Sequence, residues 1–202
     1  MSAPESSGAG WRQHTGKIAA AAILTVCWVL AAALWWASHP SGPSIPVSEE
    51  RYVALLDAAE RADCRLISDK GEGFNEHTTE PVRYATNPPL SGPHAPEPAP
   101  DTTVMPADPP SAEELVHAGE HGRIVLQVQP EADEATIAAL RTLRAVSPEH
   151  VLLTTNQTGM TAAVAATTWG RGITCATVDD AAIEAIAAFR DTYRDRGPES
   201  VD

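Results

Sequence analysis

The spacing of apolar and polar positions divides the chain into stretches of different character. Residues 18–37 form an unbroken run without a charged side chain, and residues 38–47 hold three prolines without any periodic pattern. From residue 48 onward, apolar positions recur at the intervals of helices and strands. We therefore expect a tail over 1–17, a transmembrane helix over 18–37, a stalk over 38–47 and one folded domain over 48–202.

Within the folded domain, the pattern predicts helices that alternate with short strands. Apolar residues three or four positions apart predict helices over 49–62, 111–121 and 131–145, and a last helix capped by Asp179 or Thr177. Short apolar runs between turn residues predict strands over 124–129, 151–155, 163–169 and 173–177. This order predicts an α+β domain in which a mixed or antiparallel sheet carries its helices on one face.

A proline-rich loop over 88–110 interrupts the pattern. It holds nine of the 17 prolines in the chain. Proline lacks the backbone donor and fixes φ, so neither a helix nor a central strand is expected there. The loop is either an extended wrap around the domain or a disordered excursion.

The apolar run over 18–37 is long enough to cross a bilayer. Its 20 residues span about 30 Å as a helix, the thickness of a hydrocarbon core. Arg12 and Lys17 precede the run and no Lys or Arg lies in the stalk, so the positive-inside rule places the N-terminus in the cytoplasm. A cleaved signal peptide is the alternative, but Trp35 and Trp36 stand where small residues should precede the cut. We expect a single-pass protein of the cell membrane with an extracytoplasmic main domain.

The net charge of −13 excludes one class of partner. Glu5, Arg12 and Lys17 are the only charged residues before residue 18, so nearly all of the negative charge belongs to the folded domain. An acidic surface repels phosphate backbones. We therefore expect no nucleic-acid binding, and the charge serves either solubility or the enrichment of cations.

Two of the three cysteines, Cys64 and Cys175, fall in the folded domain. Oxidation is permitted outside the cytoplasm, which favours a disulfide between them. The alternatives are two reduced thiols, or a thiolate that binds a metal ion.

The most distinctive chemistry lies in residues 117–121, which read His-x-x-Glu-His. Within a helix, His117 and His121 project from the same face, where two imidazoles can grip one metal ion. The same pattern is the inverted signature of zinc proteases, in which Glu120 would activate a metal-bound water. The chain shows no serine or cysteine nucleophile in a recognisable elbow and no glycine-rich phosphate loop, so enzymatic activity is the less favoured interpretation.

Two further histidines, His77 and His94, lie in loops near these distinctive segments. Together with His117 and His121 they are the candidate ligands for copper or zinc. The alternative is that the rings only bond backbone carbonyls and order their loops.

Three other side chains are candidates for a binding surface: Tyr84, Trp169 and Arg171. Arginine binds carboxylates through two parallel hydrogen bonds, so Arg171 beside a large aromatic side chain indicates contact with an anion or a protein partner. The alternative is a core tryptophan beside an arginine that pairs with an acid of the same domain.

Several segments, taken in order, are similar to a known family. They are ADC at 62–64, His77, YATNPPLSGPH at 84–94, LVHAGEHGR at 115–123, AATTWGR at 165–171 and YRDRGPE at 193–199. These segments resemble a bacterial family of membrane-anchored proteins catalogued as a domain of unknown function, DUF 3105. The resemblance covers residues 48–199. It implies the location, the extent of the domain and the importance of the histidine segments, but it supplies no activity.

The leading hypothesis is a membrane-anchored extracytoplasmic domain that binds copper or zinc through histidines. A non-enzymatic module that binds another envelope protein is the second hypothesis, and a metal-dependent hydrolase is the third.

Overall fold

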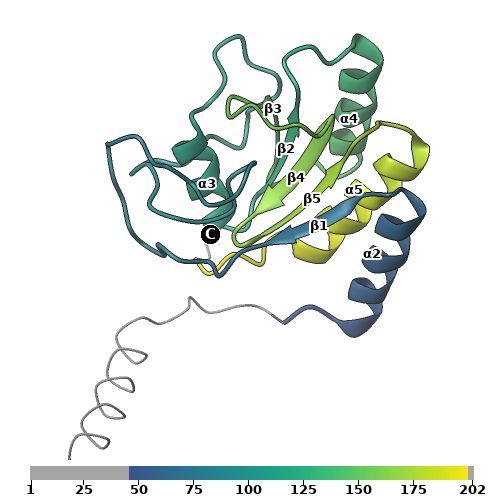
Figure 1. Ribbon diagram of the computed structural model, residues 1–202, viewed down its shortest axis with the longest axis horizontal. Helices are drawn as coiled ribbons and strands as arrows, with labels where there is room; N and C mark the ends of the chain where they lie inside the picture. Colours follow the sequence, from purple (N-terminus) through teal and green to yellow (C-terminus); the bar gives the residue numbers. More distant parts are fainter. Residues whose placement is uncertain (1–45, 200–202) are drawn as a thin grey trace, which may run out of the picture. The chain divides into compact units, whose positions relative to one another are not determined.

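The computed structural model describes residues 46–199, which form an α+β domain with four helices and a five-stranded mixed sheet (Figure 1). All described residues belong to one compact unit. No helix within residues 46–199 is long and apolar enough to cross a membrane. The predicted tail, the predicted transmembrane helix and most of the predicted stalk lie outside the described residues.

The four helices lie close to the predicted positions, because each begins at a strong local capping signal. They are α2 (Glu49–Arg61), α3 (Ala112–Glu120), α4 (Glu134–Val146) and α5 (Asp180–Tyr193). Each cap side chain accepts a hydrogen bond from a backbone N–H of the first turn, and the caps are Ser48, Ser111, Asp133 and Asp179. Helix α3 begins with a complete capping box, in which Ser111 and Glu114 each accept from the other's backbone. It ends before Gly122, whose φ of +77° suits glycine.

The strands form one sheet in the order β1-β5-β4-β2-β3. They are β1 (Arg65–Ser68), β2 (Ile124–Val128), β3 (Val151–Thr155), β4 (Val164–Thr168) and β5 (Arg171–Cys175). Strands β2 and β3 are parallel, whereas the other neighbouring pairs are antiparallel. The sheet is therefore mixed. Strand β1 was not predicted, because its four residues are too few to show a pattern.

Helices cover both faces of the sheet, so the prediction that they pack on one face is wrong. On one face, Ile124 and Leu126 of β2 enter a core shared with α2, α4 and α5. The other face carries α3 (Figure 1), and there Val125 of β2 packs with Leu115 and Ala118 of α3. All residues of β2 and β4 are buried, as expected for strands covered on both sides.

Residues 88–110 form an extended wrap, the first of the two predicted alternatives. The Met105 N–H donates to the Leu153 carbonyl over 2.7 Å, and the Leu153 N–H donates to the Thr103 carbonyl over 3.0 Å. This part of the loop therefore extends the edge of the sheet beside β3. Nearer to α3, the Ala99 N–H donates to the Glu114 carbonyl over 3.0 Å. The loop is thus held against the face of the sheet that carries α3.

Cys64 and Cys175 are joined by a disulfide with an S–S distance of 2.04 Å. The bridge links the residue before β1 to the last residue of β5, the antiparallel neighbour of β1. The disulfide alternative therefore holds, and neither cysteine is a free thiol or a metal ligand.

Glycine at position 119 allows α3 to approach the sheet closely. The Trp169 N–H donates to the Gly119 carbonyl over 3.2 Å, and the Thr168 hydroxyl donates to the same oxygen over 3.2 Å. A Cβ at Gly119 would lie 3.1 Å from the Trp169 nitrogen and 3.2 Å from the Thr168 carbonyl carbon. Both are backbone atoms held by these hydrogen bonds, so only glycine fits here without a shift.

We expect loss of the disulfide to destabilise the domain. The bridge closes a loop across 111 residues, and a loop of that size stabilises a fold by about 4–5 kcal/mol in the chain-entropy model. Chemical denaturation of the Cys64→Ser/Cys175→Ser variant should show that its free energy of unfolding is lower by about this amount. The denatured but unreduced chain should react with a thiol reagent once, at Cys27. Three reactive thiols would contradict the pairing.

We expect Gly119→Ala to lower stability despite its better helix propensity. Alanine gains about 1 kcal/mol over glycine in a helix, whereas forcing a methyl group against a held backbone costs about 1–3 kcal/mol. The net change measured by thermal or chemical denaturation should therefore be a loss of about 1 kcal/mol. A rise in the melting temperature would show that the turn after β4 yields to the methyl group.

Candidate metal centre

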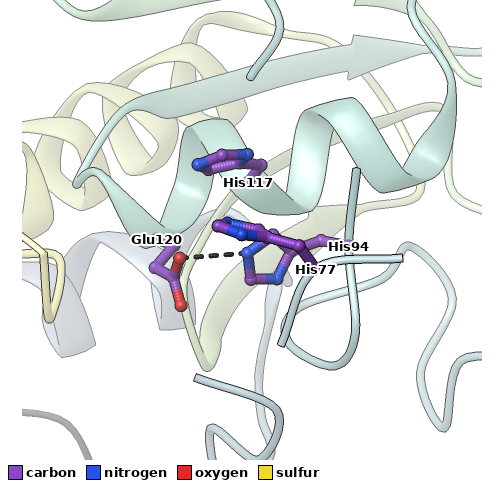
Figure 2. A group of neighbouring side chains, drawn as sticks. All are labelled: His77, His94, His117 and Glu120. Atoms are coloured by element: carbon purple, nitrogen blue, oxygen red, sulfur yellow. Dashed lines mark ion pairs between the residues drawn. The ribbon is translucent and has the colours of Figure 1, made fainter. Parts of the chain in front are cut away.

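Four side chains from three segments converge on the face of the sheet that carries α3 (Figure 2). We call His77, His94, His117 and Glu120 the inner cluster. His117 and Glu120 lie three residues apart on α3 and therefore share one side of the helix. His77 and His94 come from two loop segments that pair through a short parallel bridge.

Backbone hydrogen bonds fix the loop that carries His94 beside the loop that carries His77. The Thr78 N–H donates to the His94 carbonyl over 2.7 Å, and the His94 N–H donates to the Glu76 carbonyl over 3.0 Å. Tyr84 supports the same loop, since its hydroxyl donates to the Pro93 carbonyl over 2.9 Å. The backbone therefore positions both histidines before any ligand is considered.

The geometry of the inner cluster suits one metal ion. Its four ligand atoms all lie within 4.8 Å of one another. Four such atoms fall within about 3 Å of a common point, compared with metal–ligand bonds of about 2.1 Å. The ring centroids of His77 and His94 lie 5.0 Å and 4.8 Å from that of His117. Small side-chain rotations would close the cluster around an ion.

Backbone carbonyls set which ring nitrogen faces the cluster. The Nδ1 atom of His94 lies 2.9 Å from the Gly92 carbonyl oxygen, and the Nδ1 atom of His117 lies 2.7 Å from the Ala95 carbonyl oxygen. A carbonyl only accepts, so each Nδ1 carries the proton and each Nε2 presents a lone pair when the ring is neutral. Metal-binding histidines are commonly oriented in this way. The predicted carbonyl contacts are thus present, and they are compatible with metal binding.

Glu120 is the buried acid of the inner cluster, with a side chain that is 0% exposed. Its Oε1 accepts from the Asn75 N–H over 2.9 Å. Its Oε2 lies 3.0 Å from Nε2 of His94, which is also 0% exposed. The two atoms form an ion pair without hydrogen-bond alignment, and within residues 46–199 neither has a hydrogen-bond partner. Buried polar atoms without partners are rare, and these two both belong to the inner cluster.

The inner cluster combines one carboxylate with two buried histidines whose pKa values move in opposite directions. Burial lowers the pKa of His94, but Glu120 and the Gly92 carbonyl outweigh burial and leave that pKa above its ordinary value. Burial raises the pKa of Glu120, but His94 and the Asn75 N–H leave it below its ordinary value. Burial lowers the pKa of His117, which favours its neutral form. The ionised carboxylate of Glu120 is therefore stabilised by positive charge, and a cation bound beside it would act in the same sense.

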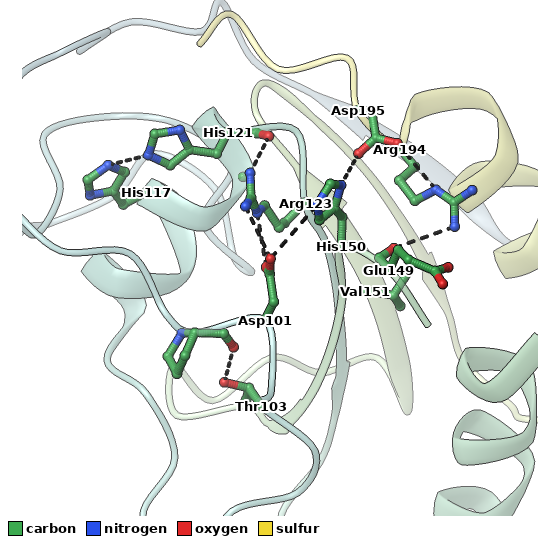
Figure 3. A network of polar contacts seen from close by, with 12 residues as sticks. Asp101, Thr103, His117, His121, Arg123, Glu149, His150, Val151, Arg194 and Asp195 are labelled. Atoms are coloured by element: carbon green, nitrogen blue, oxygen red, sulfur yellow. Dashed lines mark hydrogen bonds and ion pairs between the residues drawn. The ribbon is translucent and has the colours of Figure 1, made fainter. Parts of the chain in front are cut away.

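His121 lies beside the inner cluster without belonging to it. Its Nε2 is 2.8 Å from Nε2 of His117, and the two rings stack with centroids 4.6 Å apart (Figure 3). With Glu199 the two histidines form a second group of ligand atoms, which we call the outer group. His117 therefore belongs to both groups.

Two of the three candidate residues of a binding surface line the same pocket, whereas Tyr84 is not among the residues that line it. Trp169 and Arg171 line one pocket of about 670 Å³, with Tyr52, Lys70, Tyr193 and Arg196 among its other walls. Tyr84 instead packs under the loop before His94, and burial, assisted by Glu113, raises its pKa. Trp169 also meets His94 edge to face, with centroids 5.6 Å apart. Trp169 therefore contacts the inner cluster and also lines the pocket.

Two acids of the candidate centre were not predicted as ligands. Glu120 was considered only as the base of the less favoured hydrolase, although its spacing from His117 already places it on the same side of the helix. Glu199 comes from the segment after α5, and only the fold brings it near His121. Its place in a short Gly-Pro-Glu sequence carries no signal of metal binding.

The comparisons with known proteins bear on the family and not on the activity. The model of the family described as "Protein of unknown function (DUF3105)" matches residues 76–202. This stretch includes every residue of the inner cluster and of the outer group. Comparisons with curated proteins and with solved structures give no match. The family match covers more than half of the sequence, and the chain therefore belongs to the DUF3105 family.

Proposed function

We propose that the chain is a membrane-anchored protein whose extracytoplasmic domain binds one transition metal ion in the inner cluster. The observation that carries the proposal is the pair of fully buried atoms, Nε2 of His94 and Oε2 of Glu120, which face each other without hydrogen-bond partners among the described residues. A metal ion between them would satisfy both. His77 and His117 complete the set, since their ring nitrogens lie within the same 4.8 Å.

The ligand chemistry favours zinc or copper(II). Three imidazoles and one carboxylate are borderline ligands that suit both ions. Thiolate ligands would favour softer ions, but the sulfur atoms of Cys64 and Cys175 are bonded to each other in the disulfide. The inner cluster itself offers only nitrogen and oxygen ligands.

Two features support the proposed location. The run over 18–37 is long enough to span a membrane, and the basic residues precede it. The disulfide between Cys64 and Cys175 is typical of a domain outside the cytoplasm, because cytoplasmic thiols are kept reduced.

A second candidate function is the binding of a protein or small-molecule partner in the envelope. The pocket lined by Trp169 and Arg171 favours it, because Lys70 and Arg196 add further positive charge there in a strongly acidic chain. Hydrolysis has less support. The Glu120 carboxylate, which would have to activate a water molecule, is fully buried between His94 and the Asn75 N–H.

We expect the full-length chain, purified without a histidine tag, to bind close to one equivalent of zinc or copper. His77→Ala should weaken this binding at least about tenfold, because an exposed ligand is lost while the backbone contacts of its loop remain. His150→Ala is the matched control, since His150 pairs with Asp195 outside both groups. Isothermal titration with each metal, and circular dichroism of each variant, measure affinity and folding.

A folded chain that binds neither zinc nor copper would contradict the proposal. The partner-binding pocket would then be the better-supported function. An equal loss of metal affinity in the His77→Ala and His150→Ala variants would also argue against a metal site in the inner cluster.

Glu120→Gln tests whether the carboxylate is a ligand or a base. The amide keeps the shape and the acceptor for the Asn75 N–H but removes the charge, so metal affinity should fall about tenfold or more. Metal content and thermal stability are measured on the same preparation. Full retention of metal together with loss of a peptidase activity would instead favour the hydrolase.

A further inference from the structure

The pocket of about 670 Å³ that Trp169 and Arg171 line is built at one end of the sheet, where β1 ends and β5 begins. Ser68, the last residue of β1, is paired there with Arg171, the first residue of β5. Tyr193 at the end of α5 and Tyr52 near the start of α2 supply further walls. A pocket of this volume suits a small organic molecule.

Hydrogen bonds to backbone carbonyls hold the walls of this pocket in place. The Asp69 N–H donates to the Gly170 carbonyl over 3.2 Å, and the Gly170 N–H donates to the Leu90 carbonyl over 2.9 Å. The Arg196 guanidinium donates to the Pro46 carbonyl over 2.7 Å, which joins the segment after α5 to the residues before α2. The pocket is therefore formed before a ligand enters, as ligand sites usually are.

Aromatic side chains are concentrated in this pocket. Six aromatic residues lie within residues 46–199, and four of them line the pocket, namely Tyr52, Trp169, Phe189 and Tyr193. Phe189 is fully buried and its ring centroid lies 5.0 Å from that of Tyr193, whereas Tyr52 is 43% exposed. The aromatic lining therefore extends from the apolar core to the surface, and it suits a ligand with a flat apolar body.

The charge of the pocket is opposite to that of the chain. Acidic residues outnumber basic ones by 27 to 14 in the sequence. The pocket instead has three basic residues and one acid, which are Lys70, Arg171, Arg196 and Asp69. The Oδ1 atom of this acid already accepts from the Gly71 N–H over 2.9 Å. A cationic pocket on an acidic domain concentrates anions at that one place.

The two arginines of the pocket keep donors for a ligand. Arg171 donates to the Gly170 carbonyl over 3.0 Å from one nitrogen, which leaves other N–H groups of its guanidinium. The Nε atom of Arg196 has no hydrogen-bond partner within residues 46–199. Among those residues, neither arginine forms an ion pair with a carboxylate. Burial raises the pKa of Tyr193, and the nearby charge of Arg171 acts in the opposite direction.

We propose that this pocket binds a small aromatic carboxylate, with the carboxylate at Arg171 and the aromatic body against Tyr52 and Trp169. The planar fork of arginine matches a carboxylate through two parallel hydrogen bonds. The chain has no glycine-rich phosphate loop, which favours a carboxylate over a phosphate. The inference names the ligand class of the second candidate function, on which it rests, and it requires no metal ion in the inner cluster.

The matched probes are naphthylacetate and naphthylacetamide, which share an aromatic body and differ in charge. Isothermal titration of the full-length chain in mild detergent gives the affinity for each, with titrations into detergent alone as blanks. Acetate and inorganic phosphate test the anion without the aromatic body. The expected result is about one equivalent of naphthylacetate per chain, bound at least about tenfold more tightly than each of the other three compounds.

Two substitutions separate recognition of the charge from recognition of the aromatic body. Arg171→Gln should weaken naphthylacetate binding at least about tenfold and leave naphthylacetamide binding unchanged. Tyr52→Ala should weaken the binding of both compounds about threefold or more, because one aromatic wall is lost. Arg83→Gln is the matched control, since Arg83 is an exposed arginine that does not line the pocket. Circular dichroism checks that each variant is folded.

Four results would overturn the inference. They are equal affinities for naphthylacetate and naphthylacetamide, binding of phosphate as tight as that of naphthylacetate, no binding of naphthylacetate to the folded chain, or equal losses in the Arg171→Gln and Arg83→Gln variants. Equal affinities for the two aromatic compounds would leave the second candidate function standing with an uncharged ligand. A zinc titration of the same preparation tests the inner cluster separately, so that failure of the metal site and failure of this inference are distinguishable.

Discussion

The candidate centre depends on one buried charge, the carboxylate of Glu120. A carboxylate removed from water is costly unless donors or cations surround it. The Asn75 N–H and the His94 ring supply the two contacts that the structure shows. Segments without regular secondary structure are therefore held to α3 by charge as well as by apolar contact. A bound metal ion would extend the same neutralisation, which links the order of these loops to the proposed function.

The burial of that charge requires α3 to lie very close to the sheet. Gly119 makes this approach, and its carbonyl receives hydrogen bonds from Thr168 and Trp169 at the end of β4. The same turn places the Trp169 ring perpendicular to the His94 ring. The close approach at Gly119 thus accounts both for the burial of the Glu120 side chain and for the position of the Trp169 ring beside His94. A residue that weakens an isolated helix is the residue that this packing needs.

Much of the fold was predictable from local signals, whereas the centre was only partly so. Helix starts were found because capping residues such as Ser111 and Asp179 act within one turn. The positions of helices on both faces were missed, although β2, in which Gln127 is the one polar residue, has the nearly continuous apolar character of a strand covered twice. Three histidines of the inner cluster were candidates from sequence. Glu199 was not, because its approach to His121 depends on contacts across the whole domain.

The two faces of the sheet divide stability from chemistry. The core shared by α2, α4 and α5 contains 18 buried residues, whereas the cluster under α3 contains five, so most apolar burial lies on the first face. The disulfide belongs to this first face too, since Cys175 is part of that core. The second face therefore tolerates a buried acid, four histidines and extended loops without losing the fold. Such a division explains how a small domain can keep polar atoms without hydrogen-bond partners in its interior. A ligand bound on the α3 face would therefore stabilise the part of the domain that has the least apolar burial.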